Sequence, residues 1–138
     1  MKKRNISLIF SILFISSVCW AQEKMPAALA PMGALGEFSE MEKQIIFNSL
    51  QESLSTYYLL ASQKSFEAAQ EKAFEELEYD ECNEDQCIML IQEMLQVENV
   101  FHLQIIVEGK DSQLSLSYRN LYEKMKVTDV CLGCGTFE

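Results

Sequence analysis

The chain has 138 residues, of which 49% are hydrophobic and 23% are charged, and its formal net charge is −10. This length fits one domain, and the hydrophobic fraction excludes an intrinsically disordered tail. The excess of acidic residues argues against binding to nucleic acid or to an anionic membrane surface, because both require clustered Lys and Arg.

Residues 1–21 have the three parts of a secretory signal peptide. A Lys-Lys-Arg start precedes an apolar stretch from Ile6 to Val18, and Ala21 supplies a small-residue cleavage site. The alternative is a retained membrane helix, which needs about 20 apolar residues, whereas this stretch is shorter and contains four serines. Lipidation at Cys19 is disfavoured by the Ser-Ser-Val that precedes it. We therefore expect cleavage after Ala21 and export to the periplasm, the envelope or the medium, with 8 basic residues left against 21 acidic ones, a net charge of −13.

Four cysteines lie beyond the predicted signal peptide: Cys82, Cys87, Cys131 and Cys134. An even number of cysteines in an exported protein indicates disulfides. A zinc site is the alternative, since C-x4-C and C-x2-C could supply four ligands, but nothing in the sequence indicates a reducing compartment. Of the three possible connectivities we expect the local pairs Cys82–Cys87 and Cys131–Cys134, because short loops close at the least entropic cost.

The segment 22–37 is predicted to be a linker or an irregular N-terminal segment, ahead of a single α+β domain over 38–138. It is rich in Ala, contains Pro26 and Pro31, and shows no sustained periodicity. Whether a β-strand forms between residues 26 and 36 stays open at this stage.

Three helices are predicted from caps and helical spacing. Ser39 and Glu42 form a capping box for the first helix, whose apolar stripe is Met41, Ile45, Ile46, Leu50 and Leu54. Ser62 caps the second, and Asn83 caps the third. The expected inward residues of the second helix are Phe66, Ala69, Ala73 and Leu77, and those of the third are Cys87, Ile91, Met94 and Leu95.

The predicted strands show a period of two residues. Residues 57–61 form a short apolar run typical of a buried strand, and the alternating stretches 101–107 and 114–118 flank a turn at Gly109–Asp111. A last strand is expected over 125–131. The fold class is therefore α+β: a two-layer sandwich with helices packed on one face of a mostly antiparallel sheet that ends in a C-terminal β-meander.

The order of these elements, with Cys82-x4-Cys87 opening a helix and Val97–Val100 entering a strand, resembles a small α/β domain of bacterial envelope proteins. It is similar to the domain of the curli secretion channel protein (CsgG-like), to the N-terminal domain of the Tol system's periplasmic propeller protein, and to a domain of lipoproteins that activate peptidoglycan synthases. Members of this group usually open with a hydrophobic strand, where this chain has the Ala-rich segment. The resemblance implies a non-enzymatic binding or assembly module.

No catalytic site is predicted. His102 is the single histidine, and its alternation with Leu103 and Ile105 places it on the polar face of a strand, without a nucleophile motif beside it. The Cys131-x2-Cys134 spacing supports an alternative function, a small envelope thiol-disulfide oxidoreductase. A reactive pair of this kind sits at a helix N-terminus, however, and only four residues follow Cys134.

Acidic residues crowd the second predicted helix and the loop after it. The run 75–85 contains seven carboxylates but lacks the Gly that a calcium-binding EF-hand loop requires at its sixth position. We expect a solvated surface that could serve as an interaction face toward a basic partner. Its residues are Glu67, Glu71, Glu75, Glu78, Asp80 and Glu81. The expected partner is another envelope protein, with no cofactor, no metal, no nucleic acid and no membrane insertion of the mature chain.

Overall fold

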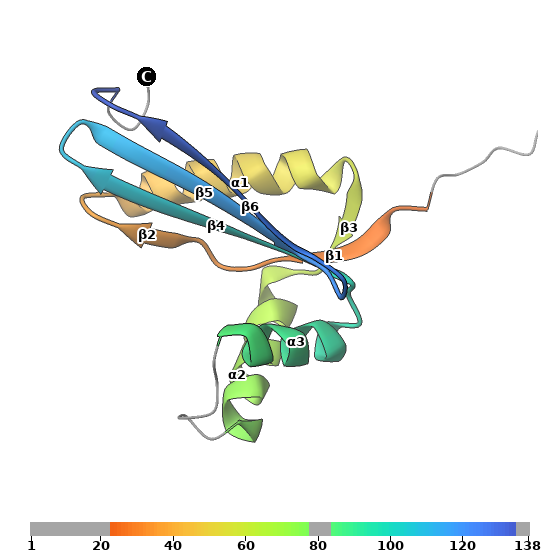
Figure 1. Ribbon diagram of the computed structural model, residues 1–138. Coiled ribbons are helices and arrows are strands. Elements are labelled where there is room, and N and C mark those ends of the chain that lie inside the picture. Colours follow the sequence, from red (N-terminus) through yellow and green to blue (C-terminus); the bar gives the residue numbers. More distant parts are fainter. Residues whose placement is uncertain (1–22, 78–83, 135–138) are drawn as a thin grey trace, which may run out of the picture.

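One mixed sheet organises the residues that the computed structural model describes, 23–77 and 84–134. The elements in chain order are β1 (Met25–Leu29), β2 (Gly33–Leu35), α1 (Glu40–Ser55), β3 (Tyr58–Leu60), α2 (Gln63–Glu76), α3 (Glu84–Leu95), β4 (Asn99–Glu108), β5 (Asp111–Arg119) and β6 (Lys124–Cys131). The strand order is β3-β1-β4-β5-β6, and β2 also pairs with β4 (Figure 1). The α+β class and the C-terminal meander are confirmed.

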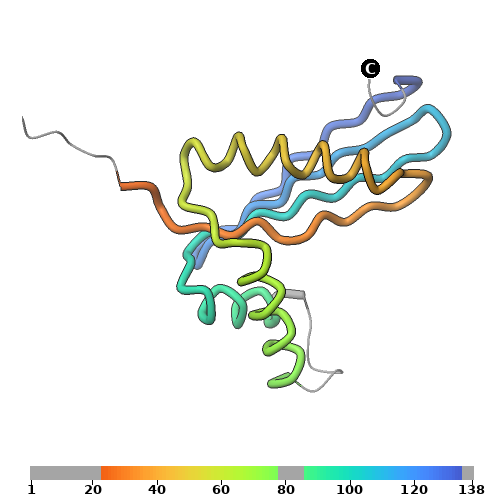
Figure 2. The backbone as a smooth tube through the Cα atoms, turned by 180° about the vertical axis from the view of Figure 1, so that it is seen from behind, coloured from red at the N-terminus to blue at the C-terminus, as the bar shows by residue number. Residues whose placement is uncertain are grey.

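The helices cover both faces of the sheet, which corrects the expected two-layer arrangement. Phe101 packs with α1, whereas its neighbour Val100 packs with α2 and α3. Successive residues of a strand point to opposite faces, so α1 lies on one face and the α2–α3 pair on the other (Figures 1 and 2). We call these the α1 face and the α2–α3 face.

Strand order explains this placement. The chain passes from β1 outward to β3 through α1, and then returns past β1 to β4 through α2 and α3. All three strands run parallel, and parallel crossovers are right-handed. Two right-handed crossovers that travel in opposite directions must pass over opposite faces. The sequence pattern predicted the helices but carried no information about this reversal.

The Ala-rich segment is not a linker: it contains β1, which lies between β3 and β4. Ala27 and Ala28 have no exposed surface, because Ala27 faces α1 and Ala28 faces α2 and α3. Small side chains allow helices to approach both faces of this strand. The prediction failed because alanine has low strand propensity and because Pro26 and Pro31 suggested a break; Pro26 is tolerated near the start of the strand.

The predicted helix starts are confirmed where the structure describes them. The Ser39 hydroxyl accepts from the Glu42 backbone N–H at 3.2 Å, and the Glu42 carboxylate accepts from the Ser39 N–H at 2.7 Å. Ser62 likewise accepts from the Ser65 N–H at 3.1 Å. The expected cap Asn83 lies outside the described residues. The predicted inward residues Phe66, Ala69, Ala73, Cys87 and Ile91 are buried.

The short apolar strand is an edge strand and not a buried one. Leu59 of β3 is 66% exposed, because β3 ends the sheet beyond β1. Its neighbour Tyr58 packs edge-on against Phe101 of β4, which in turn contacts Tyr118 of β5. This aromatic row on the α1 face joins the parallel half of the sheet to the meander.

The β4–β5 hairpin follows the predicted alternation. Phe101, Leu103, Ile105 and Val107 are all buried on the α1 face. The two strands pair over nine residues up to Glu108 and Asp111, and Gly109 takes a φ of 63° in the tight turn, as a two-residue hairpin turn requires.

Candidate interaction site

The last strand, β6, is the most exposed element of the sheet. Seven of its eight residues are exposed, from Lys124 to Val130. It pairs with β5 on one side, and no described strand pairs with its other side. We call this outer side of β6, from Lys124 to Val130, the open edge.

Two hydrogen bonds establish which backbone groups face the open edge. The Asn120 N–H donates to the Glu123 carbonyl at 3.0 Å, which makes Asn120 and Glu123 a hydrogen-bonded pair at the turn. Hydrogen-bonded and non-hydrogen-bonded pairs alternate along an antiparallel ladder, so the backbone groups of Lys124, Lys126, Thr128 and Val130 point away from β5. In agreement, the Val130 N–H donates to the Asp129 carboxylate at 3.0 Å instead of to β5.

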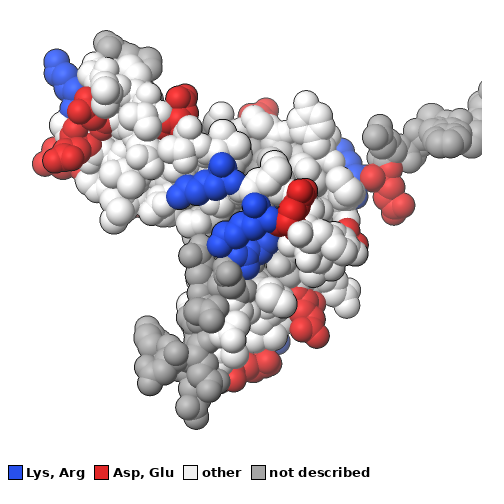
Figure 3. Space-filling model, in the orientation of Figure 1, with Lys and Arg blue, Asp and Glu red and all other residues white. Residues whose placement is uncertain are grey.

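The side chains of β6 divide by chemistry between the two faces of the sheet. The strand register places Lys124 beside Arg119, and Lys126 beside Ser117 and His102, on the α2–α3 face. On the α1 face, Met125 is 51% exposed and Val127 is 66% exposed. Lys and Arg side chains gather at the centre of the α2–α3 face in Figure 3, which views the molecule from that side. The part of the strand from Lys124 to Val127 therefore presents cations to one side and apolar groups to the other, whereas Asp129 and Val130 do not follow this division.

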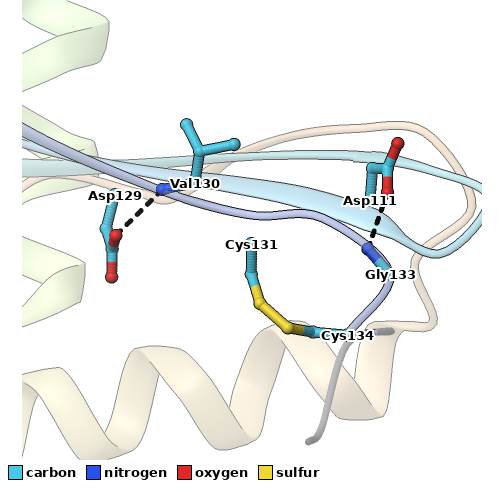
Figure 4. The surroundings of a disulfide bond; sticks show 6 residues. All are labelled: Asp111, Asp129, Val130, Cys131, Gly133 and Cys134. Carbon is cyan, nitrogen blue, oxygen red and sulfur yellow. Dashed lines mark hydrogen bonds between the residues drawn. A yellow bond between two sulfur atoms is a disulfide. The ribbon is translucent and has the colours of Figure 1, made fainter.

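A disulfide ends this strand. Cys131 and Cys134 are joined, with Cα atoms 5.8 Å apart, within the usual span of about 4.4–6.8 Å. Gly133, with a φ of 77°, lies within the loop, and its N–H donates to the Asp111 carboxylate at 2.7 Å (Figure 4). The disulfide closes the loop after β6, and the hydrogen bond from Gly133 to Asp111 joins this loop to the start of β5.

Cys87 is also disulfide-bonded and is buried. Its expected partner, Cys82, lies outside the described residues, so the Cys82–Cys87 pairing stays a prediction. Glu78, Asp80 and Glu81 of the expected acidic face lie in the same undescribed segment. The described members of that face, Glu67, Glu71 and Glu75, are all exposed on α2, and their role in binding stays a prediction.

His102 lies beside a pocket and not beside a nucleophile motif. The pocket of about 280 Å³ opens between α2, α3 and the sheet, and its wall is mostly apolar. Besides His102, it is lined by residues that include Phe66, Gln70, Ala73, Phe74 and Ile91. Cys131 ends a strand, so this cysteine lacks the helix N-terminus that activates the thiol of a reactive pair.

Within residues 23–77 and 84–134, no three His, Cys, Asp or Glu side chains come together in a way that could hold a metal ion. No helix in the same part of the chain has the length and apolar character needed to cross a membrane.

The fold and its exposed meander define a class: a small α+β domain with helices on both faces of one half of a mixed sheet. Solved structures that are similar to this chain include two C-terminal domains of LpoB. The domain from Salmonella enterica matches with a TM-score of 0.58 and 11% identity, over 78% of this chain and 82% of that one. The Escherichia coli domain matches with a TM-score of 0.56 and 10% identity, over 76% and 82%. At this identity the likeness shows the fold alone.

No protein-family model matches the sequence, and no curated protein matches it significantly. The structural neighbours correct the family expected from the sequence, because they are LpoB domains and not the curli secretion channel or the Tol propeller domain. The cysteine spacing on which that expectation depended is a local feature, whereas the arrangement of strands is a property of the whole domain.

Sequence reasoning predicted β6 as a strand but not as a candidate interaction site. The signal was present in Lys124, Met125, Lys126 and Val127, where basic and apolar residues alternate. Their exposure could not be predicted, because an alternating strand in the interior of a sheet has the same pattern.

Proposed function

We propose that this chain is an exported, non-enzymatic module of the bacterial envelope that binds another protein through its C-terminal meander. The observation that carries the proposal is β6, a regular strand that is exposed over seven of eight residues and has an open edge. Exposed apolar side chains beside polar ones mark protein interaction sites. The likeness to the LpoB C-terminal domains supports the fold on which this proposal is built.

Photo-crosslinking in the intact envelope tests the proposal. A photoreactive amino acid at Val127 is expected to form an adduct with one partner protein. Met41 is the matched control position, because it is 74% exposed and belongs to α1 instead of β6. Adducts of equal yield from Met41 would contradict a specific site on the meander.

A third position separates the two candidate surfaces. The same photoreactive residue at Glu71 samples the acidic face of α2. An adduct from Glu71 without one from Val127 would move the interaction to the acidic face, where binding should weaken with salt because the contact would be mainly electrostatic.

Export and the absence of thiol chemistry are tested separately. Protein recovered from the envelope is expected to begin at Gln22, and intact Met1 in a cytoplasmic pool would contradict export.

Thiol titration of the untreated protein is expected to give no free thiol. Ready reduction together with insulin-reductase activity would instead support the oxidoreductase function of Cys131 and Cys134.

A further inference from the structure

The two edges of the sheet are unequal. β3 has three residues and is followed, after Ala61 and Ser62, by α2. β6 has eight residues, contains no proline, and keeps an unbroken register with β5. Proteins usually protect an edge strand by shortening it, by bulging it, or by placing a proline or lysines in it. β6 has only the lysines, Lys124 and Lys126, so an added strand must carry charges that complement them. A strand of this kind is a template for the addition of another strand.

The hydrogen-bonding groups restrict where a further strand can pair. The outward backbone groups belong to Lys124, Lys126, Thr128 and Val130, as the ladder alternation requires. The Val130 N–H is already engaged by the Asp129 carboxylate at 3.0 Å. The segment around Lys126 and Thr128 is therefore the part of the edge that can receive a partner.

The side chains of that segment define the chemistry of the partner. Residues opposite one another in a sheet point to the same face. A residue paired with Lys126 points to the same face as the Lys126 ammonium group, where a carboxylate is favoured. A residue paired with Met125 or Val127 joins the exposed apolar side chains of the α1 face. The complementary strand alternates acidic and apolar residues.

A second copy of the chain fits this edge poorly. The outward backbone groups all belong to even-numbered residues, so antiparallel self-pairing must place even residues opposite even ones. Lys126 of both copies would then lie on the same continuous face. Like charges this close across strands are destabilising.

We propose that the open edge of β6 receives an extended segment of the partner, with alternating acidic and apolar residues, as an added antiparallel strand. This inference rests on the proposed function and names the chemistry of the partner for the same site. It requires that the edge, and not only the exposed side chains, takes part in binding.

The test uses the protein purified from the envelope and a blocked octapeptide that alternates glutamate with valine. Hydrogen exchange measured by NMR is expected to slow at the outward amides of Lys126 and Thr128 when this peptide is added, because these amides gain partners. A peptide with lysine in place of glutamate is expected to bind about tenfold more weakly, since the cross-strand attraction to Lys126 becomes a repulsion.

A charge reversal in the protein sharpens the test. Lys126→Glu is expected to weaken binding of the glutamate peptide about tenfold and to strengthen binding of the lysine peptide. The control is Lys72→Glu, which makes the same change of charge at an exposed position on α2 and is expected to leave both affinities unchanged. Thermal melts verify that both variants fold.

Three results would overturn the inference. They are equal binding of the two peptides, binding without slowed exchange in β6, and concentration-dependent protection of β6 by the protein alone, which would assign the edge to a second copy. Each of these can occur while Val127 still crosslinks to a partner in the envelope, so failure of the inference is distinguishable from failure of the proposed function.

Discussion

β1 and β6 belong to one sheet but have opposite environments. β1 lies between two strands and beneath helices on both faces, and Ala27 and Ala28 have no exposed surface. β6 lies at the edge, and only Cys131 of its eight residues is not exposed. Burial of apolar surface is the main stabilising term in folding, so the half of the sheet around β1 should determine stability. The meander should contribute less to stability and more to binding.

The largest expected effect is in the helix-covered half. Phe66 is 2% exposed in the cluster that covers Ala28, and Phe66→Ala should lower the free energy of unfolding by about 3–5 kcal/mol, because a cavity replaces the ring. Phe74→Ala is the matched control on the same helix, where the ring is 47% exposed. Chemical denaturation measures both variants, and equal losses would contradict the assignment of the core to this side of α2.

Gly36 provides the next test, because the chain turns there from β2 toward α1. Its φ is 101°, and an added Cβ would overlap the backbone carbonyl of Val107. Gly36→Ala should therefore lower the free energy of unfolding by about 3 kcal/mol. Gly109→Ala, at a φ of 63° with no atom near the added Cβ, should lower it by about 1 kcal/mol. If thermal denaturation shows equal losses for the two variants, the close approach to Val107 is unimportant.

The disulfide of the meander should have an intermediate effect. Replacing both Cys131 and Cys134 with alanine should lower the free energy of unfolding by about 2 kcal/mol, the chain-entropy value for so short a loop. The circular dichroism spectrum should stay unchanged, since the link lies at the end of the meander. Loss of the folded spectrum would show that the meander, and not only the half around β1, is required for folding.

The smallest effect is expected on β6 itself. Val127→Thr places a hydroxyl at a site that is 66% exposed, and it should change the free energy of unfolding by less than about 0.5 kcal/mol. Val107→Thr makes the same change on the same face of β4, where the side chain is 7% exposed, and should cost about 1–3 kcal/mol. Urea denaturation compares the two, and similar values would remove the distinction between the halves.

Periodicity and caps predicted much of the fold. The Ser39 and Ser62 caps, the buried stripe of α2, and the alternation of β4 are determined by neighbours within one or two turns of the chain. The sequence predicted β6 as a strand but placed the interaction face on the acidic helix, and that face stays a prediction. Charge density is visible in a sequence, whereas the open edge on which the proposed function depends is not.

The sequence by itself determined which segments form helices and strands, because capping hydrogen bonds and side-chain periodicity are local. Tertiary structure alone decided that alanines form the covered strand β1, since only helices packed on both faces explain why small side chains are needed there. It also decided that β6 stays at the edge. The position of a strand in a sheet depends on which other strands pair with it, and those contacts join residues that lie far apart in the chain.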